Sequence, residues 1–417
     1  MKPDIVLLPG RNNYALILPG TIMYGLDVNT ESDLAGLIKE AEEYEDNSYI
    51  ETGNPSVSTI GLIPTFDCNL RCIYCYARGG DSKEILSFTV ATDAIRYIHE
   101  TEGNDSLKID LVGGGEPLLY IDLVGNIVHY AQTLFKNVEV HVVSNTTFGK
   151  KTLDWITANN VLVRVSYDGV MQDLQRPFVS GQSSKLIVTG NIRNLVDAKV
   201  SLMVQCIVTS NGVHTLRETL NELIDMGVNT VKFEAARSTD VSRRANWTEP
   251  NPVEYANALL DVIEYAAEQK KDIKIDTGYF SVPNETGYCG ISGHNRMITP
   301  TGLITSCLEV SRPTDPYSDK IIYGEVSNGK IAVNFDKQRE LNNINLSKQI
   351  GGCASCNLKL ICRGGCPMEG IWEYGFPLKK SGYTCAVEHV FLPRLLLRMA
   401  EDPKIVSVVA NEVKILC

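Results

Sequence analysis

Three cysteines in the first fifth of the chain are spaced to share one metal centre. Cys68, Cys72 and Cys75 form a C-x3-C-x2-C segment that directly follows an apolar run expected to be a strand. Three thiolates within eight residues can surround one metal centre and leave one coordination position open, which suits chemistry more than a closed structural site. The alternative is a zinc loop whose fourth ligand lies elsewhere in the chain.

A second group of cysteines occupies the last third of the chain. Its centre has the spacing C-x2-C-x5-C-x3-C, starting at Cys353. Clustered cysteines in a chain without a recognisable secretion signal favour metal ligation over disulfides. A four-cysteine zinc site that begins at Cys353 and Cys356 is the structural alternative. The group comprises Cys289, Cys307, Cys353, Cys356, Cys362, Cys366 and Cys385.

Alternating strands and helices are expected to position the first group. The pattern predicts a parallel sheet covered by helices, in the form of a partial barrel whose functional residues lie at the carboxyl ends of the strands. Expected helices cover 89–102, 119–135, 150–159, 187–199, 213–226 and 252–270. Expected strands are Thr59–Thr65, Leu107–Val112, Val138–Ser144, Val161–Tyr167, Leu202–Val208 and Thr230–Glu234.

The remaining segments flank this pattern. Before the barrel we expect three short strands, a helix over Leu34–Tyr44 and a linker at 46–56; the strands are Asp4–Leu8, Tyr14–Leu18 and Met23–Val28. A further helix is expected near the C-terminus, at Val387–Met399. We therefore expect an α/β protein with a partial (β/α)6 TIM-type barrel. The expected domains are an N-terminal strand and helix segment at 1–55, the barrel at 56–280, a cysteine-rich domain at 281–390, and a C-terminal helix and tail at 391–417.

Composition excludes several classes of protein. The net charge of −11 argues against binding to a nucleic-acid backbone. No apolar run is long enough to span a membrane, and no secretory leader is evident, so we expect a cytoplasmic location. The charge is uneven, since residues 1–60 hold three Lys and Arg against ten Asp and Glu. A solvated surface explains this acidic bias as well as a basic partner does.

The segment Cys68–Cys75, with Tyr74 before its third cysteine, resembles the cluster loop of radical S-adenosylmethionine (SAM) enzymes. The resemblance implies a [4Fe–4S] cluster on the three cysteines, with SAM bound to the fourth iron. One-electron cleavage of SAM then gives methionine and a 5′-deoxyadenosyl radical that abstracts hydrogen from a substrate. The open position deduced from the three thiolates agrees with this chemistry.

The resemblance also implies residues that contact SAM. Glycines after the second strand would let the backbone approach the ligand, and Glu116 would accept a charged donor. Capping and turn formation are the alternatives for the polar residues, and Cys206 is expected to be a buried core residue. Besides Tyr74, the implied contacts are Gly114, Gly115 and Glu116 for the methionine amino group, Ser144, Asn145, Ser166 and Asp168 for the ribose and carboxylate, and Gln205.

The seven later cysteines resemble the SPASM extension, which carries two auxiliary [4Fe–4S] clusters and brings the implied total to three. By matching positions, the outer cluster would be held by Cys353, Cys356, Cys362 and Cys385, and the inner one by Cys289, Cys307 and Cys366. The usual eighth cysteine is absent from Tyr279–Tyr288. The inner cluster would then have an open iron, or be completed by Cys206, by Cys417 or by a substrate thiolate.

The resemblance implies an enzyme that modifies a peptide. We expect a maturase that forms a thioether, carbon–carbon or related link in a ribosomally made precursor peptide, with residues 1–46 as part of a leader-binding element. Formylglycine formation in a sulfatase is the alternative, and a zinc-stabilised protein or an iron–sulfur electron carrier belongs to another class. Expected partners are the precursor peptide and a reductant such as a flavodoxin or ferredoxin, with no nucleic acid and no membrane.

Overall fold

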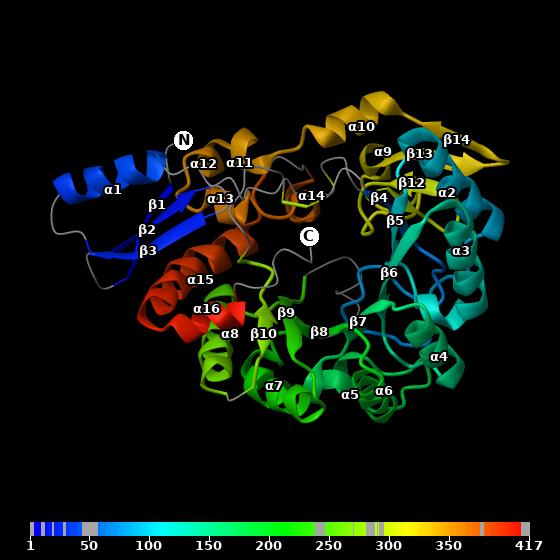
Figure 1. The fold of residues 1–417 in the computed structure, drawn as a ribbon, viewed down its shortest axis with the longest axis horizontal. Coiled ribbons are helices and arrows are strands. Elements are labelled where there is room, and N and C mark those ends of the chain that lie inside the picture. Colours follow the sequence, from blue (N-terminus) through cyan, green and yellow to red (C-terminus); the bar gives the residue numbers. More distant parts are fainter. Residues whose placement is uncertain are drawn as a thin grey trace.

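A computed structural model gives the fold (Figure 1). Helices lie along the outside of a curved row of strands, and the N-terminal strands and the C-terminal helices lie together at one end of it. No helix in the described part of the chain is long and apolar enough to cross a membrane. The structure describes residues 4–9, 13–18, 21–27, 31–43, 57–237, 247–269, 271–280, 288–289, 291, 296–375 and 379–409.

Among the described residues, eleven strands form one sheet in the order β10-β9-β8-β7-β6-β5-β4-β11-β12-β13-β14. From β4 to β10 each strand pairs in parallel with the next, as expected for a partial barrel. These strands are β4 (Val57–Leu62), β5 (Ser106–Leu111), β6 (Asn137–Ser144), β7 (Leu162–Ser166), β8 (Leu202–Val208), β9 (Thr230–Ala235) and β10 (Lys274–Asp276).

The two faces of this sheet differ in polarity. Along β7, Val163 and Val165 are fully buried, whereas Arg164 and Ser166 are half-buried. Successive side chains of a strand point to opposite faces, so the valines pack under the helices and the polar residues face the inside of the barrel. The inner face is therefore available for chemistry.

The connecting helices cover the outer face. Several present apolar residues at helical spacing toward the sheet, as in α7, where Leu216, Leu220 and Leu223 are buried. Short turns η1 (Pro117–Tyr120), η2 (Gly169–Met171) and η3 (Val213–Thr215) follow β5, β7 and β8. The helices are α2 (Phe88–Glu102), α3 (Ile121–Leu134), α4 (Lys150–Ala158), α5 (Gln172–Gln175), α6 (Lys185–Asp197), α7 (Leu216–Asp225) and α8 (Pro252–Glu268).

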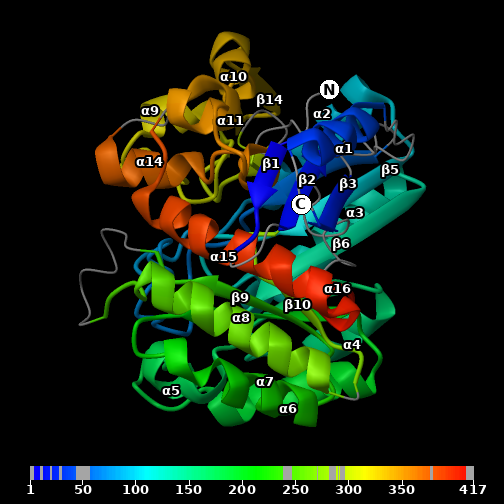
Figure 2. The same ribbon diagram turned by 90° about the vertical axis from the view of Figure 1, so that its left-hand side faces the viewer.

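The cysteine-rich region extends the sheet from its other edge. β11 pairs in parallel with β4, and β12 to β14 continue the sheet as antiparallel hairpins. Figure 2 shows α15 and α16 crossing the barrel beside α8, which both of them contact. The strands are β11 (Met297–Ile298), β12 (Leu303–Thr305), β13 (Ile322–Ser327) and β14 (Lys330–Val333). The helices are α9 (Ser318–Ile321), α10 (Phe335–Asn342), α11 (Leu346–Gln349), α12 (Gly351–Ala354), α13 (Lys359–Cys362), α14 (Pro367–Tyr374), α15 (Gly382–Glu401) and α16 (Pro403–Val409).

The N-terminal segment forms a separate three-stranded antiparallel sheet in the order β1-β2-β3. Its bounds are β1 (Asp4–Leu7), β2 (Asn13–Leu18) and β3 (Thr21–Asp27), followed by α1 (Glu31–Glu43). One face buries Ile17 in the main core, and the other packs Leu16 against α1. β3 contacts α15, and the side-chain amide of Asn357 donates to Ile5 O at 3.0 Å. The sheet therefore lies on the cysteine-rich region.

Some expected boundaries differ from the structure. The first barrel strand ends at Leu62 rather than Thr65, because the chain turns toward the cysteine loop and Thr65 makes only an isolated bridge to Ile85. α15 starts before the expected Val387 and runs through position 390, where a domain boundary was expected. The expected linker at 46–56 lies outside the described residues.

Candidate functional site

The first cysteine group lies in a loop that leaves the sheet at the carboxyl end of β4. Gly80 N donates to Phe66 O at 2.7 Å, which joins the two ends of the loop. The Arg71 guanidinium lies inside the loop and donates to the carbonyl oxygens of Cys68, Leu70 and Gly80. Arg71 thus holds a loop that has no regular secondary structure of its own.

The three thiols of this loop fit a shared metal cluster. Cys68, Cys72 and Cys75 are free. Burial is the main cause that raises the pKa of Cys68 and of Cys72 to about 12, and neighbouring thiols contribute to the rise. Buried thiols with such pKa values stay protonated at neutral pH unless a cation supplies compensating charge. The donor set and its spacing suit a cluster held by three thiolates.

Each of these sulfurs also has an N–H donor nearby. Such donors are typical around metal-bound thiolates, because they orient the ligand and stabilise its negative charge. The contacts are Gly79 N to Cys75 Sγ at 3.3 Å, Arg176 Nη1 to Cys72 Sγ at 3.8 Å and Asn145 Nδ2 to Cys68 Sγ at 3.9 Å.

The glycine segment after β5 packs directly against the cysteine loop. Gly113 and Gly114 have φ values of +83° and +70°, in the left-handed region that favours glycine. A Cβ on Gly115 would lie 1.9 Å from the carbonyl oxygen of Asp67. Close approach of the two backbones therefore requires glycine at this position.

Glu116 is buried at the end of this segment. Its carboxylate accepts from Ser144 Oγ at 2.8 Å, Asn145 N at 2.7 Å and Leu118 N at 3.1 Å. Burial raises the pKa of Glu116 to about 7, although these hydrogen bonds lower it. Each of these donors is neutral, so the carboxylate is oriented for a further, cationic partner. The structure thus brings Glu116, Ser144 and Asn145 together beside the loop.

Asp168 is the centre of a second buried cluster. Its carboxylate accepts from the Tyr74 hydroxyl, from Arg176 Nε at 2.9 Å, from Gln175 Nε2 at 2.7 Å and from Ile207 N at 2.9 Å. Arg176 lies over the Tyr74 ring, with 5.2 Å between its guanidinium carbon and the ring centroid. Asp168 therefore orients residues that touch the cysteine loop. Sequence analysis missed Arg176 because it belongs to no local motif.

Ser166 and Gln205 lie opposite each other on β7 and β8. Gln205 is turned toward the last strands of the barrel, where its side-chain amide donates to Glu234 Oε2 at 2.7 Å. Cys206, the next residue, is buried as expected, and burial raises the pKa of its thiol well above the usual range.

Four cysteines of the second group line one cavity between α12, α13 and α15. Lys380 Nζ donates to Cys385 Sγ at 3.4 Å, and Leu358 N donates to Cys356 Sγ at 3.4 Å. The buried carboxyl group of Glu388 borders the same cavity. These four residues are the ones that the resemblance assigns to the outer cluster: Cys353, Cys356, Cys362 and Cys385.

The other three cysteines lie near one another. Burial raises the pKa of the Cys307 thiol well above its usual range, and nearby Glu309, Cys366 and Cys289 raise it further. Cys206 lies instead near Asp168, and Cys417 lies outside the described residues. Cys289, Cys307 and Cys366 therefore lie in one region of the structure.

The spacing of cysteine ligands differs between a single zinc ion and a four-iron cluster. Within the described ranges, no three His, Cys, Asp or Glu side chains lie close enough together to hold one metal ion. A Zn–S distance of about 2.3 Å places sulfurs about 3.8 Å apart around one tetrahedral ion. Cysteines around a four-iron cluster each bind a different iron and so stand farther apart.

Residues 62–204 match the Radical SAM superfamily model, so the barrel is that of a radical SAM enzyme. The mycofactocin maturase MftC of Mycolicibacterium smegmatis is 25% identical over 342 residues, which are 77% of this chain and 80% of MftC. This match extends well beyond the barrel.

Two solved structures share the fold. A structure of anSMEcpe with bound AdoMet and Kp18Cys peptide has a TM-score of 0.68 at 18% identity, covering 83% of this chain and 99% of anSMEcpe. Streptococcus suis SuiB bound to S-adenosylmethionine has a TM-score of 0.59 at 14% identity, covering 92% and 98%. Both structural matches include the cysteine-rich region, because each match covers a much larger share of this chain than the barrel alone does.

Proposed function

We propose that this enzyme is a peptide maturase that forms a new link in a ribosomally made precursor peptide. The carrying observation is that the three-cysteine loop follows β4 at the carboxyl end of the barrel strands, and that Cys366 of the second group lies 3.4 Å from Arg237, which follows β9 at the same end. Relatives of the same architecture support a peptide substrate. The structure of SuiB has been solved with the precursor peptide SuiA, and the structure of anSMEcpe has been solved with the Kp18Cys peptide.

The proposed roles of the residues follow from their contacts. Cys68, Cys72 and Cys75 hold the first cluster, and Arg71 keeps their loop folded around it. When bound, this cluster and SAM supply a 5′-deoxyadenosyl radical by one-electron cleavage. Glu116 pairs with the SAM amino group, because the carboxylate is buried and oriented by neutral donors.

Other polar residues complete the proposed SAM site. Ser144, Asn145, Ser166 and Asp168 line the carboxyl ends of the strands next to the loop, where the resemblance places ribose and carboxylate contacts. Asp168 acts partly through Tyr74 and Arg176, since its carboxylate is already engaged by both. Gln205 has the weakest support, because its amide binds Glu234.

The second cysteine group would hold two auxiliary clusters, making three in all. The outer one would lie in the cavity at α15 and the inner one above the barrel. Link formation removes two hydrogen atoms from the peptide: one leaves to the radical, and the other leaves as a proton and an electron. An auxiliary cluster held by Cys289, Cys307 and Cys366 would accept that electron.

Two macromolecular partners belong to the proposal. The sheet β1–β3 has β1 and β3 at its edges, and a leader peptide would add to an edge strand through backbone hydrogen bonds. The first cluster also needs a one-electron donor, such as a flavodoxin or ferredoxin.

Mass spectrometry of a co-expressed peptide tests the function. The peptide encoded beside the gene should lose the mass of two hydrogen atoms only when the enzyme has Cys72, and fragmentation should locate a link between two residues. A peptide that instead gains an aldehyde, detected with a hydrazide probe, would contradict link formation and favour formylglycine synthesis. An unchanged mass with active SAM cleavage would contradict the choice of substrate.

A further inference from the structure

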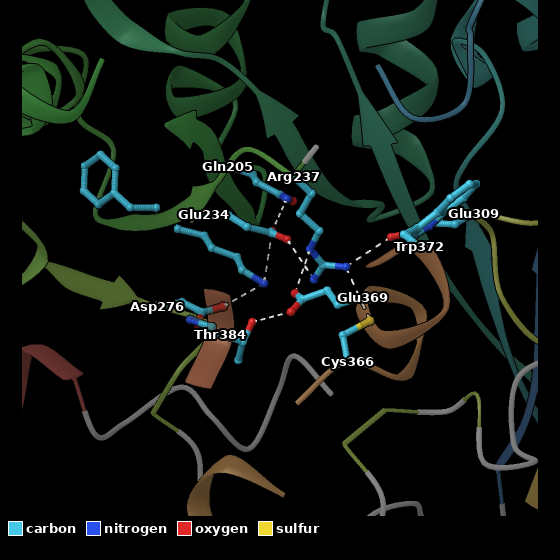
Figure 3. A network of polar contacts seen from close by, with 12 residues as sticks. Gln205, Glu234, Arg237, Asp276, Glu309, Cys366, Glu369, Trp372 and Thr384 are labelled. Carbon is cyan, nitrogen blue, oxygen red and sulfur yellow. Dashed lines mark hydrogen bonds and ion pairs between the residues drawn. The ribbon is translucent and has the colours of Figure 1, made fainter. Parts of the chain in front are cut away.

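A polar network connects the last barrel strands to the cysteine-rich region (Figure 3). At its centre is Arg237, which follows β9 at the carboxyl end of the barrel. Its guanidinium contacts Glu309 Oε1 at 3.1 Å, Glu369 Oε1 at 3.3 Å and Glu234 Oε1 at 3.8 Å. The three carboxylates come from β9, from the loop after β12 and from α14, so one cation joins three elements.

Each carboxylate is itself held by a second donor. Trp372 Nε1 donates to Glu309 Oε2 at 2.9 Å, Thr384 Oγ1 donates to Glu369 Oε2 at 2.5 Å, and Gln205 Nε2 donates to Glu234 Oε2 at 2.7 Å. Lys232 also lies 3.6 Å from Glu234 and 3.8 Å from Asp276. The guanidinium is therefore fixed in orientation by partners that cannot turn freely.

The same guanidinium reaches a cysteine of the proposed inner cluster. Arg237 Nη1 donates to Cys366 Sγ at 3.4 Å, while Nη1 also binds Glu309. An N–H donor and a positive charge at a ligand sulfur stabilise the reduced, more negative state of an iron–sulfur cluster. Solvent screens this contact only in part, because the Arg237 side chain is 31% exposed and Cys366 is buried.

We propose that Arg237 is a positioning residue that raises the reduction potential of the inner auxiliary cluster through Cys366. This inference rests on the proposed ligation of that cluster by Cys289, Cys307 and Cys366. The network around Arg237 would then have a redox role in addition to joining the barrel to the cysteine-rich region. A cluster with a raised reduction potential accepts an electron from the substrate more readily. The network holds Arg237 against both Cys366 and the last barrel strands, so the cluster would lie beside the barrel in which the substrate reacts.

A matched control exists at the outer cluster. Lys380 Nζ donates to Cys385 Sγ at 3.4 Å, so it is also a cationic donor to a ligand sulfur. Lys380 is exposed, and solvent screening weakens its charge. Replacing Lys380 should therefore move the potential of the outer cluster, by a smaller amount, and leave the inner cluster unchanged.

The test is a redox titration followed by electron paramagnetic resonance. It uses the full chain with Cys68, Cys72 and Cys75 replaced by Ala, so that only the auxiliary clusters contribute. The signal lost in Cys366→Ala identifies the inner cluster. Arg237→Gln should lower the midpoint potential of that signal by about 59 mV, a tenfold change for one electron. Arg237→Lys should give a smaller shift in the same direction, and Lys380→Gln should move only the other signal.

An unchanged inner-cluster potential in Arg237→Gln would overturn the inference, and so would an equal shift of both clusters. Iron content and thermal unfolding show whether the variant is intact. If Arg237→Gln loses the cluster, Arg237→Lys provides the test, because lysine keeps the charge but lacks the planar donor group. An unchanged midpoint potential in Arg237→Lys would then contradict the inference. A cluster signal that persists in Cys366→Ala would instead refute the proposed ligation.

Discussion

Two buried carboxyl groups show how single residues set the chemistry of the site. Asp168 faces the Arg176 guanidinium, whereas Glu116 accepts hydrogen bonds from neutral groups only. Burial without an opposite charge raises the pKa of Glu116 to about 7. Near pH 7 the carboxylate is therefore only partly ionised, and a cation bound beside it, as the ammonium group of SAM would be, favours its ionised form.

This pKa predicts a pH dependence of SAM binding. A protonated Glu116 cannot pair with an ammonium group, so the Kd for SAM should rise as the pH falls below about 7, approaching tenfold per pH unit. Equilibrium dialysis of SAM against the cluster-loaded enzyme, from about pH 8 to about pH 5.5, measures it. Glu116→Gln should bind weakly at every pH. A Kd for the wild type that does not change over this range would contradict the role of Glu116.

The same carboxyl group affects stability without SAM. Its folded-state pKa is above its usual value of 4.5, so the folded chain binds the proton more tightly than the unfolded chain. Its contribution to the free energy of unfolding is therefore fully present below pH 4.5 and is lost as the pH rises through about 7.

Single residues also show the limit of sequence analysis. The cysteine spacings and the Gly114–Glu116 segment are local patterns, and they predicted which residues the structure gathers around the barrel. Arg176 could not be predicted in this way, because it reaches Cys72 from 104 positions along the chain. Arg237 was missed for the same reason, since its partner Cys366 is 129 positions away.

At the scale of elements, the N-terminal sheet belongs to the main core. Val6, Leu8, Ala15 and Ile17 of the β1–β2 hairpin are buried together with residues of the rest of the chain. Apolar runs broken by Pro9-Gly10 and Pro19-Gly20 predicted the three strands. Such runs could not predict the surface that covers the buried face of the sheet. The strands β11 to β14 escaped prediction because residues 281–386 are rich in Gly, Pro, Ser and Asn, which are typical of turns and loops.

Paired substitutions test this placement of the sheet. Ile17→Ala should lower the free energy of unfolding by about 2–5 kcal/mol, because it leaves a cavity in the core. Leu7→Ala should change it by less than about 0.5 kcal/mol, because Leu7 is 57% exposed on the same sheet. Urea denaturation measures both values. Equally small effects would show that the sheet is attached without sharing the core.

At the scale of the whole molecule, the barrel and the cysteine-rich region form one structure. β11 pairs with β4, and α15 crosses α8, so the two regions share a sheet and a helical layer. Both cysteine groups are thereby fixed relative to the barrel mouth. This arrangement suits a reaction in which hydrogen abstraction and electron removal occur on one bound peptide.

The cluster content can be predicted from this arrangement. Anaerobically reconstituted protein should hold about twelve iron atoms per chain, four for each of three cubane clusters. Cys362→Ala should lower this to about eight, because Cys362 lines the outer cavity. Cys206→Ala is the matched control and should keep the full content, since Cys206 is buried in β8 and does not line the outer cavity. Zinc in place of iron would contradict the assignment of both groups.

The central claim is that three cysteines of one loop make this chain cleave SAM. The most direct measurement is the formation of 5′-deoxyadenosine by the reduced, reconstituted enzyme, followed by liquid chromatography. The wild type should form 5′-deoxyadenosine and methionine in equal amounts, and Cys72→Ala should form neither, while Cys362→Ala should retain this activity. Formation of 5′-deoxyadenosine by Cys72→Ala at the wild-type rate would contradict the account.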